Sequence, residues 1–266
     1  MGFSQDEVER YARHLVLREV GGPGQQKLKA AKVLMVGAGG LGAPAALYLA
    51  AAGVGTIGLV DPDTVSLSNL QRQVLYAASD VGRSKVEAAK EHLNALNPHV
   101  TVATHAVWLD PQNANELVQR YDLVLDGTDD FATRFAVSDA CLAHGKPLVS
   151  GALGRWTGQV GVFHGKPCYR CLVPEVPPDA ETCALVGVVG ALAGVIGSMM
   201  ALEAVKLITG AGEPLSGKLL IHDALATETR TVRIGADPVC PACGASEQDG
   251  SSRPGSYGSD GGSAIR

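Results

Sequence analysis

The segment that most constrains the fold is residues 33–44, V-L-M-V-G-A-G-G-L-G-A-P. An apolar run leads into glycines at positions 37, 39 and 42, which is the G-x-G-x-x-G spacing, and an alanine-rich stretch follows. This spacing is typical of a tight turn between a buried strand and a helix, where backbone N–H groups and the helix N-terminus face a phosphate. The motif therefore predicts a strand–loop–helix unit that binds a nucleotide or a dinucleotide.

Short apolar runs alternate with helical stretches as far as residue 152. We expect strands over residues 32–37, 56–61, 100–107, 122–126 and 147–152, with helices over 41–52, 81–96, 112–121 and 130–144. This alternation predicts an α/β fold with a Rossmann-like, doubly wound and mostly parallel sheet. Beyond residue 153 the segments 157–163, 217–224 and 227–234 look like antiparallel strands that extend the sheet.

Four parts follow from this pattern. They are an N-terminal helical arm (1–31), a nucleotide-binding half (32–152), a second half of the same domain with the cysteines, a loop and the antiparallel strands (153–244), and a Gly/Ser-rich tail (245–266) for which we expect disorder. In the arm, Ser4 and Glu7 have the spacing of a capping box, and the glycines of residues 21–24 are expected to end the helical segment. Arg13 lies about 140° around the helix from Val8 and is expected to project outward.

One apolar run, residues 184–202, carries no charge and is just long enough to cross a bilayer. It lacks basic or aromatic flanking anchors, so we interpret it as a buried helix that continues to about residue 210. The N-terminus has no export pattern, which predicts a cytoplasmic protein. The formal net charge of −5 argues against nucleic-acid binding.

Four of the six cysteines form two C-x-x-C pairs, Cys168 with Cys171 and Cys240 with Cys243. Two thiolate pairs suit a tetrahedral zinc ion, and four sulfur ligands leave no open position for catalysis. We therefore predict a structural zinc knuckle. Cys141 is expected to be a core residue. Cys183 follows a polar loop, and both a buried thiol and a nucleophilic thiol remain open for it.

Polar residues follow the second and fourth predicted strands. Asp61 ends the second strand, where an acidic side chain holds ribose hydroxyls. The segment 61–73 continues with Asn69, Arg72 and Gln73, and Lys85 begins the next helix. Arginine and lysine in this position favour a triphosphate over a dinucleotide.

The segment D-G-T-D-D (126–130) follows the fourth strand at the carboxyl edge of the sheet, where open α/β sheets bind ligands. Carboxylates beside a triphosphate suggest Mg²⁺. We assign Asp129 to this role and Asp130 to capping the following helix.

These motifs, taken in order, resemble the MoeB/ThiF family, whose members are bacterial relatives of ubiquitin-activating enzymes. The resemblance rests on G-A-G-G-L-G, D-x-D-x-V-x-x-S-N-L-x-R-Q, G-x-x-K, D-G-T-D-D, the paired C-x-x-C and G-x-x-G-x-I-G-S-x-x-A-x-E-A-x-K, and it runs from about residue 8 to residue 244. Y-A-R-H-L near the start and C-P-A-C-G at the end are closest to the molybdopterin-synthase branch of adenylyltransferases.

The resemblance implies that the C-terminal glycine carboxylate of a small ubiquitin-like sulfur carrier attacks the α-phosphate of ATP. The products are an acyl-adenylate and pyrophosphate. The roles that it implies are as follows: Gly37, Gly39, Gly40, Gly42, Asn69, Arg72, Gln73 and Lys85 on the phosphates, Asp61 on the ribose, Asp129 on Mg²⁺ or the reacting groups, and Arg13 in the ATP site of the neighbouring subunit of a homodimer. We expect any sulfur donor to be a separate protein.

Two interpretations of other classes stay open at this point. An NAD-dependent oxidoreductase fits the glycine loop but leaves Arg72, Lys85 and the cysteine pairs unexplained. A non-catalytic nucleotide-binding scaffold would not need Arg72, Lys85 and Asp129 together. Within the family, thiamin-type members use a cysteine in the loop where Cys183 lies for covalent sulfur transfer.

Overall fold

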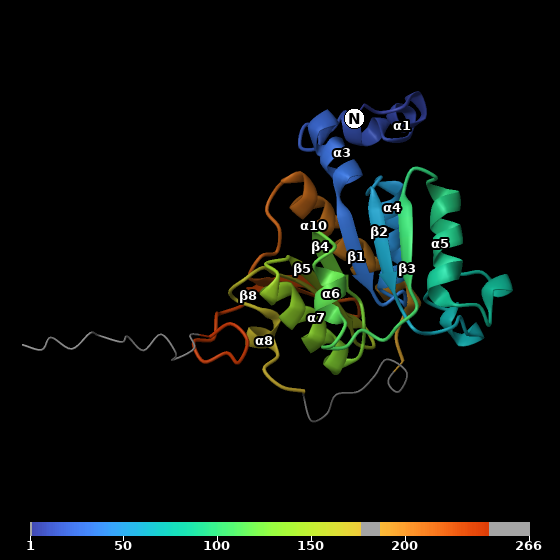
Figure 1. Ribbon diagram of the computed structural model, residues 1–266. Coiled ribbons are helices and arrows are strands. Elements are labelled where there is room, and N and C mark those ends of the chain that lie inside the picture. The colour runs from blue at the N-terminus through green and yellow to red at the C-terminus, as the bar shows by residue number, and fades with distance from the viewer. Residues whose placement is uncertain (1, 177–186, 245–266) are drawn as a thin grey trace, which may run out of the picture.

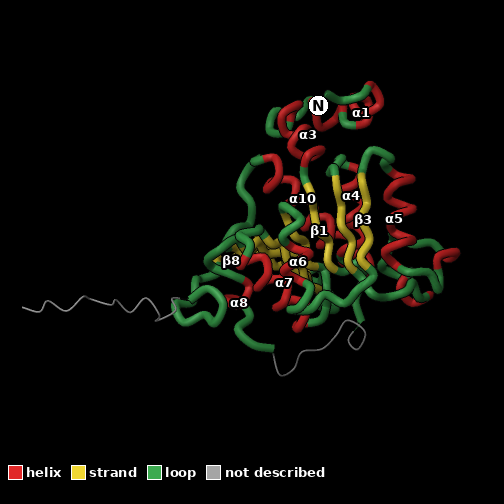
Figure 2. Tube along the Cα trace, in the orientation of Figure 1, coloured by secondary structure: helices red, strands yellow, loops and turns green. Residues whose placement is uncertain are grey.

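Eight strands form one continuous sheet in the order β3-β2-β1-β4-β5-β6-β7-β8 in the computed structural model, which describes residues 2–176 and 187–244. Figures 1 and 2 show the strands side by side, with helices in front of the sheet and behind it. The strands are β1 (Lys32–Val36), β2 (Thr56–Val60), β3 (Thr101–His105), β4 (Leu123–Asp126), β5 (Leu148–Leu153), β6 (Thr157–Phe163), β7 (Lys218–Asp223) and β8 (Glu228–Arg233).

The helices of the described residues connect and cover these strands. They are α1 (Gln5–Arg10), α2 (Ala12–Leu15), α3 (Gly21–Ala30), α4 (Gly42–Ala51), α5 (Lys85–Leu96), α6 (Ala114–Val118), α7 (Phe131–Ala143), α8 (Tyr169–Leu172) and α10 (Gly190–Thr209). Two short 3-10 turns, η1 (Leu67–Asn69) and η2 (Ala78–Asp80), lie in the polar segment after β2. Because this polar segment is four residues longer than predicted, α5 begins at Lys85 and not near residue 81.

The five strands β3, β2, β1, β4 and β5 run parallel, as the sequence predicts. The chain leaves β1 toward β2 through α4 and leaves β4 toward β5 through α7, so the two crossovers run in opposite directions along the sheet. One buried cluster packs α4, α5 and α10 on one face, and a second packs α6 and α7 on the other. The fold is therefore doubly wound, and its switch point lies between β1 and β4.

The sheet continues beyond β5 as three antiparallel strands. The hairpin of β5 and β6 pairs Leu153 with Gly158, and β7 and β8 follow in the same alternation. Burial decreases along this part, because β6 is mostly buried while every residue of β8 is exposed. The predicted antiparallel extension is confirmed, and β8 forms one edge of the sheet.

Helix α10 is long and apolar enough to cross a membrane by length and composition, and 44% of its most apolar window is buried inside the molecule. Ile196, Met200 and Ala204 are fully buried in the larger core cluster, in contact with the sheet and α4. A Cβ on Gly197 would collide with the carbonyl oxygen of Leu41 and with Pro44. This close packing of α10 on α4 supports the interpretation as a core helix of the fold.

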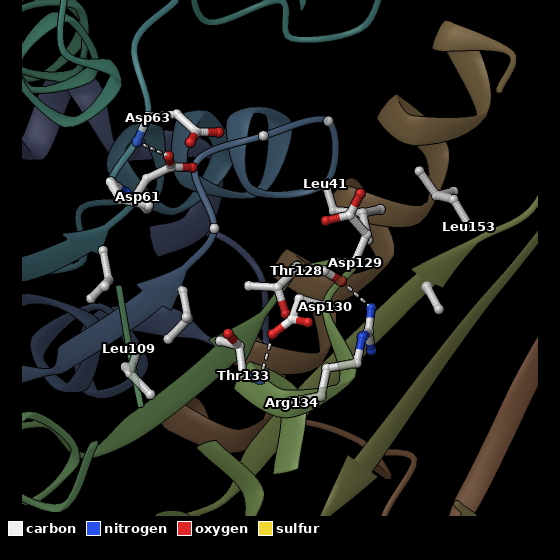
Figure 3. Close-up of a pocket in the computed structure, with 18 of the residues that line it drawn as sticks. Leu41, Asp61, Asp63, Leu109, Thr128, Asp129, Asp130, Thr133, Arg134 and Leu153 are labelled. Atoms are coloured by element: carbon white, nitrogen blue, oxygen red, sulfur yellow. Dashed lines mark hydrogen bonds between the residues drawn. The ribbon is translucent and has the colours of Figure 1, made fainter. Parts of the chain in front are cut away.

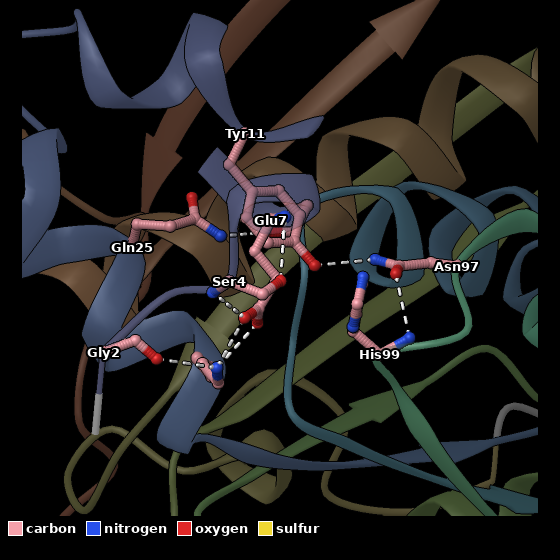
Figure 4. Close-up of polar contacts among 9 residues, drawn as sticks. Gly2, Ser4, Glu7, Tyr11, Gln25, Asn97 and His99 are labelled. Atoms are coloured by element: carbon pink, nitrogen blue, oxygen red, sulfur yellow. Dashed lines mark hydrogen bonds and ion pairs between the residues drawn. The ribbon is translucent and has the colours of Figure 1, made fainter. Parts of the chain in front are cut away.

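The N-terminal arm is attached to the amino edge of the sheet by polar contacts (Figure 4). Ser4 and Glu7 form the predicted capping box, and Lys29 pairs with Glu7 at 2.7 Å. Tyr11 packs over Gly53, and its hydroxyl accepts a hydrogen bond of 2.9 Å from the Asn97 amide. The first helices of the arm are therefore held by Lys29 of α3, by Gly53 and by Asn97, the residue that follows α5.

The prediction that residues 21–24 end the helical segment is wrong. Helix α3 begins at Gly21 and runs to Ala30. Pro23 lies in its first turn, where the backbone N–H groups have no intrahelical partner, so a proline there loses no hydrogen bond.

Candidate active site and thiol cluster

A cavity of about 460 Å³ opens at the carboxyl ends of the parallel strands, at the switch point between β1 and β4. Ligands of open α/β sheets bind at this place because the loops leave adjacent strands in opposite directions there. The cavity gathers nearly all of the predicted nucleotide-binding residues, namely Gly37, Gly39, Gly40, Asp61, Asn69, Arg72, Gln73, Lys85 and Asp129.

The glycine loop connects β1 to α4 and forms one wall of the cavity. Gly37 has a positive φ of 85°, and a Cβ there would contact the backbone of Gly127 at 3.2 Å. Gly42 does not line the cavity; a Cβ at this position would collide with the carbonyl oxygen of Gly37. Gly42 therefore allows the loop to turn tightly, while Gly37, Gly39 and Gly40 face the cavity.

Asp61 directly follows β2 and is almost completely buried. Its carboxylate accepts hydrogen bonds from the backbone N–H groups of Ala38, at 2.9 Å, and Asp63, at 3.0 Å. The side chain thus ties the glycine loop to the segment after β2 and still lines the cavity.

Lys85 is held between two carboxylates at the first residue of α5. Its ammonium lies 2.7 Å from Asp63 and 3.6 Å from Asp61, and its side chain is 7% exposed. The backbone carbonyl of Asp63 also accepts a hydrogen bond of 3.0 Å from the Lys85 N–H. Asp63 had no predicted role, although the D-x-D spacing of Asp61 and Asp63 was a signal that two carboxylates lie close together.

Asn69 ends η1, Arg72 and Gln73 lie on the turn that follows, and all three line the cavity. The Arg72 guanidinium makes one long hydrogen bond, 3.4 Å, to the carbonyl of Ser68 and is half-buried. The Gln73 side chain is buried, and its Oε1 has no hydrogen-bond partner among the described residues. A buried amide without a partner costs free energy unless a ligand satisfies it, so Gln73 is poised for a polar ligand.

Figure 3 shows the loop between β4 and α7 across the cavity from Asp61 and Asp63. Asp130 caps α7, because its carboxylate accepts the backbone N–H of Thr133 at 2.8 Å. This confirms the predicted capping role. Asp129 is exposed, lines the cavity and has no hydrogen bond or ion pair to the described residues.

Arg134, a residue that the sequence analysis did not single out, lines the cavity from α7 and is 5% exposed. Its guanidinium donates to the carbonyls of Thr128 and Gly151, the latter at 2.7 Å. Burial lowers the pKa of Arg134, but the nearby carboxylate of Asp126, 3.6 Å away, and further partners outweigh burial and raise the pKa overall. Arg134 therefore fixes the backbone of the loop that carries Asp129. No local pattern in the sequence indicated this contact.

The two C-x-x-C pairs come together although they lie far apart in the sequence. The four Sγ atoms lie within 4.8 Å of one another, with Cys168 3.6 Å from Cys240 and Cys171 3.3 Å from Cys243. A zinc tetrahedron with Zn–S bonds of about 2.3 Å has sulfur–sulfur edges of about 3.8 Å, so the cluster has nearly the required size.

The thiols of this cluster differ in their electrostatics, because burial and the neighbouring thiols raise the pKa of Cys168 and Cys171. Burial raises the pKa of Cys240, but hydrogen bonds from the N–H groups of Cys243 and Ala242 and from the neighbouring thiols outweigh it and lower the pKa to about 7. Cys141 is buried outside this cluster, as predicted.

Arg13, unlike the residues above, does not reach the cavity of its own chain. It is exposed in α2, which belongs to the N-terminal arm, and Figure 1 shows this arm at the amino ends of the parallel strands, opposite the carboxyl ends where the cavity lies. Its predicted outward projection is confirmed. Cys183 and the tail from residue 245 lie outside the described residues.

The chain is similar to known proteins over most of its length. A family model described as the ThiF family matches residues 11–242. A sulfur carrier protein adenylyltransferase from Thermus thermophilus is 48% identical over 253 residues, which cover 92% of this chain and 93% of that protein.

Two further similarities bear on length and fold. A probable adenylyltransferase/sulfurtransferase MoeZ from Mycobacterium tuberculosis is 51% identical over 247 residues, which cover 90% of this chain but 63% of MoeZ. The crystal structure of E. coli MccB with ATP superposes with a TM-score of 0.77 at 26% identity, covering 88% of this chain and 74% of that one.

Proposed function

Because the chain belongs to the ThiF family, we propose that it is an ATP-dependent adenylyltransferase that activates the C-terminal glycine of a small sulfur carrier protein. The observation that carries the proposal is the cavity at the switch point, which combines a glycine loop, three cationic side chains and the exposed carboxylate of Asp129. The resemblance of the motifs Y-A-R-H-L and C-P-A-C-G further favours a carrier of molybdopterin biosynthesis.

The residues of the cavity suit attack of one anion on another. A free C-terminal carboxyl has a pKa of about 3.5 and is already ionised near pH 7, so no general base is needed. The barrier lies in bringing this carboxylate onto the α-phosphate and in releasing pyrophosphate. Fixed positive charge and N–H groups at the phosphates lower the free-energy cost of both the approach of the carboxylate and the release of pyrophosphate. Arg72, Lys85 and the N–H groups of the glycine loop supply these donors.

Lys85 and Asp61 couple the two ends of the nucleotide in this proposal. The Asp61 carboxylate accepts hydrogen bonds from the ribose hydroxyls, because its contacts with backbone N–H groups leave some of its lone pairs free. The Lys85 ammonium, 3.6 Å from Asp61, extends from the ribose toward the phosphates. The Nε2 group of Gln73, which lies beside Gly39 of the glycine loop, donates to the same phosphates. Arg134 holds the loop backbone so that Asp129 stays at the opposite side of the cavity.

Two metal ions fit residues of the chain. Mg²⁺ usually binds through one or two carboxylates together with substrate phosphates, and Asp129 offers such a carboxylate. The ion would supply charge neutralisation at the phosphates. Zn²⁺ fits the cluster of four thiols. It would link the two C-x-x-C segments, and four sulfur ligands would leave no open coordination position.

The proposal includes a homodimer in which Arg13 acts in the cavity of the partner subunit. Its support is the exposed position of Arg13 at the edge of the sheet opposite its own cavity. Mixing inactive Arg13→Ala and Lys85→Ala variants tests this directly. We expect activity to return in the mixture, because half of the heterodimer sites then hold both residues.

The central test is carrier-dependent exchange between ATP and pyrophosphate. We expect exchange with Mg²⁺, ATP and a carrier that ends in Gly-Gly, and none when the terminal glycine of that carrier is removed. Absence of exchange with every carrier tried, combined with tight binding of NADH, would overturn the proposal. Exchange measured separately with the molybdopterin and thiamin carriers identifies the pathway.

A further inference from the structure

The cavity has two chemically different ends on either side of Asp61. The glycine loop, Arg72, Gln73 and Lys85 make one end polar and cationic. The other end is apolar and lies where β2 and β3 finish, with lining side chains Val60, Pro62, Val107, Trp108 and Leu109. Asp61 connects the two ends, because its backbone N–H donates to the carbonyl of His105, the last residue of β3, at 3.2 Å.

Trp108 is an unusual residue at the apolar end, because 65% of its surface is exposed although it lines the cavity. Its neighbour Leu109 is 3% exposed and anchors the segment in the core on the α6 and α7 face. A large aromatic side chain left in water beside a cavity loses the burial free energy that its area would provide. The arrangement makes sense when a flat ligand covers the ring.

The segment that carries Trp108 is held in place by hydrogen bonds. The Asn113 amide donates to the carbonyl of Trp108 at 2.8 Å. Asp110 and Asn113 exchange two further bonds, from the Asp110 N–H to the Asn113 side chain at 3.0 Å and from the Asn113 N–H to the Asp110 side chain at 3.1 Å. Because these bonds fix the backbone before any ligand arrives, binding at the ring costs little ordering entropy.

We propose that Trp108 is the base-stacking residue of this site and that the adenine of ATP lies against its indole ring. The inference rests on the proposed function, which puts the ribose at Asp61 and the phosphates at the cationic end. With those two parts placed, the purine extends to the apolar end, where Trp108 offers the exposed aromatic surface. Aromatic stacking of this kind accepts any purine and needs no hydrogen bond to the base.

The chain offers a matched control, because it contains only two tryptophans. Trp156 is also partly exposed, at 44%, but it lies in the turn between β5 and β6 and does not line the cavity. Trp108→Ala and Trp108→Phe are therefore compared with Trp156→Phe in the full-length protein.

The test measures binding of ATP and of tripolyphosphate, which lacks a base, by titration calorimetry. We expect Trp108→Ala to weaken ATP binding about 5- to 20-fold and to leave tripolyphosphate binding unchanged. Trp108→Phe, which keeps an aromatic ring, should stay within about threefold of the wild type. Equal weakening of both ligands would show that the loop is disrupted, and no weakening of ATP would show that the ring does not stack; either result overturns the inference.

Tryptophan fluorescence gives a second readout. ATP should quench emission in the wild type and in Trp156→Phe, but not in Trp108→Phe, and tripolyphosphate should quench none of them. The two proposals fail in different ways. Quenching and weakened ATP binding without carrier-dependent exchange leave the stacking inference intact, whereas normal exchange with unchanged ATP binding in Trp108→Ala overturns stacking alone.

Discussion

The parallel and antiparallel ends of the single sheet carry different kinds of site. At the parallel end, loops from β1, β2 and β4 leave charged and amide side chains facing a cavity, and Gln73 Oε1 stays without a protein partner. At the antiparallel end, four cysteines from two distant segments close on one another and are mostly buried. Polar groups left unpaired cost stability and serve ligand binding, whereas a closed thiol cluster serves stability and has no free position for chemistry. Substitutions at the parallel end are therefore expected to change activity, and substitutions at the antiparallel end are expected to change the free energy of unfolding.

Lys85→Ala is expected to cause the largest loss of activity while the protein stays folded. Removing the ammonium takes one fixed charge from the phosphates, so we expect carrier-dependent exchange to fall about 10³-fold. The fold should persist, because the core clusters do not depend on this side chain. Exchange assays and circular dichroism check this. Lys90→Ala on the same helix, outside the cavity, is the control and should keep its exchange rate.

Removing one thiol from the cluster should show the opposite pattern. We expect Cys240→Ser, or extraction of the bound metal by a chelator, to lower the melting temperature by about 5–10 °C while the folded fraction keeps its exchange activity. Scanning calorimetry and metal analysis measure both effects. Cys141→Ala, a buried thiol outside the cluster, should shift the melting temperature much less. A metal content near zero per chain would contradict the zinc site.

The neighbouring residues Asp129 and Asp130 have different expected roles within one loop, ligand binding for Asp129 and helix capping for Asp130. Asp129→Asn should lower exchange about 10²-fold and raise the Mg²⁺ concentration required, because a carboxylate near the phosphates is lost. Asp130→Asn should keep both activity and stability, since asparagine caps a helix about as well as aspartate. Mg²⁺ titrations of the two variants decide the point; equal losses would mean that both carboxylates serve the site.

Asp80 lies at the parallel end of the sheet but is expected to contribute to stability and not to activity. Hydrogen bonds from the Ala77 N–H and from His92 and Arg83 lower the pKa of Asp80, and the residue lies outside the cavity. A carboxyl whose pKa is lower in the folded than in the unfolded state stabilises the fold above the unfolded value of about 4 and loses this contribution as the pH falls.

Asp80→Asn should therefore lower the melting temperature at pH 7 by about 2–6 °C. The difference from the wild type should shrink as the pH falls below about 4. Thermal melts between pH 7 and pH 3 measure this, and exchange at pH 7 should be unchanged. A loss of exchange without a change in melting temperature would move Asp80 from the structural to the functional group.

Features that depend on residues close together in the chain could be predicted from the sequence. The alternation of apolar runs predicted every strand of the parallel part, and the G-x-G-x-x-G spacing predicted the turn in which Gly37 takes a positive φ and Gly42 lies against a carbonyl. The capping roles of Ser4 and Asp130 also followed from spacing. Such signals are readable because backbone geometry and side-chain period are set within a few residues.

Contacts between residues far apart in the chain became visible only in the tertiary structure. It brought Asp63 to Lys85, placed Arg134 under the loop of Asp129, put Trp108 at the rim of the cavity and closed two cysteine pairs 72 residues apart. It also placed Arg13 at the far edge of the sheet. The physical reason is that these contacts depend on strand order, and strand order is fixed by the packing of helices on both faces of the sheet and not by any local pattern.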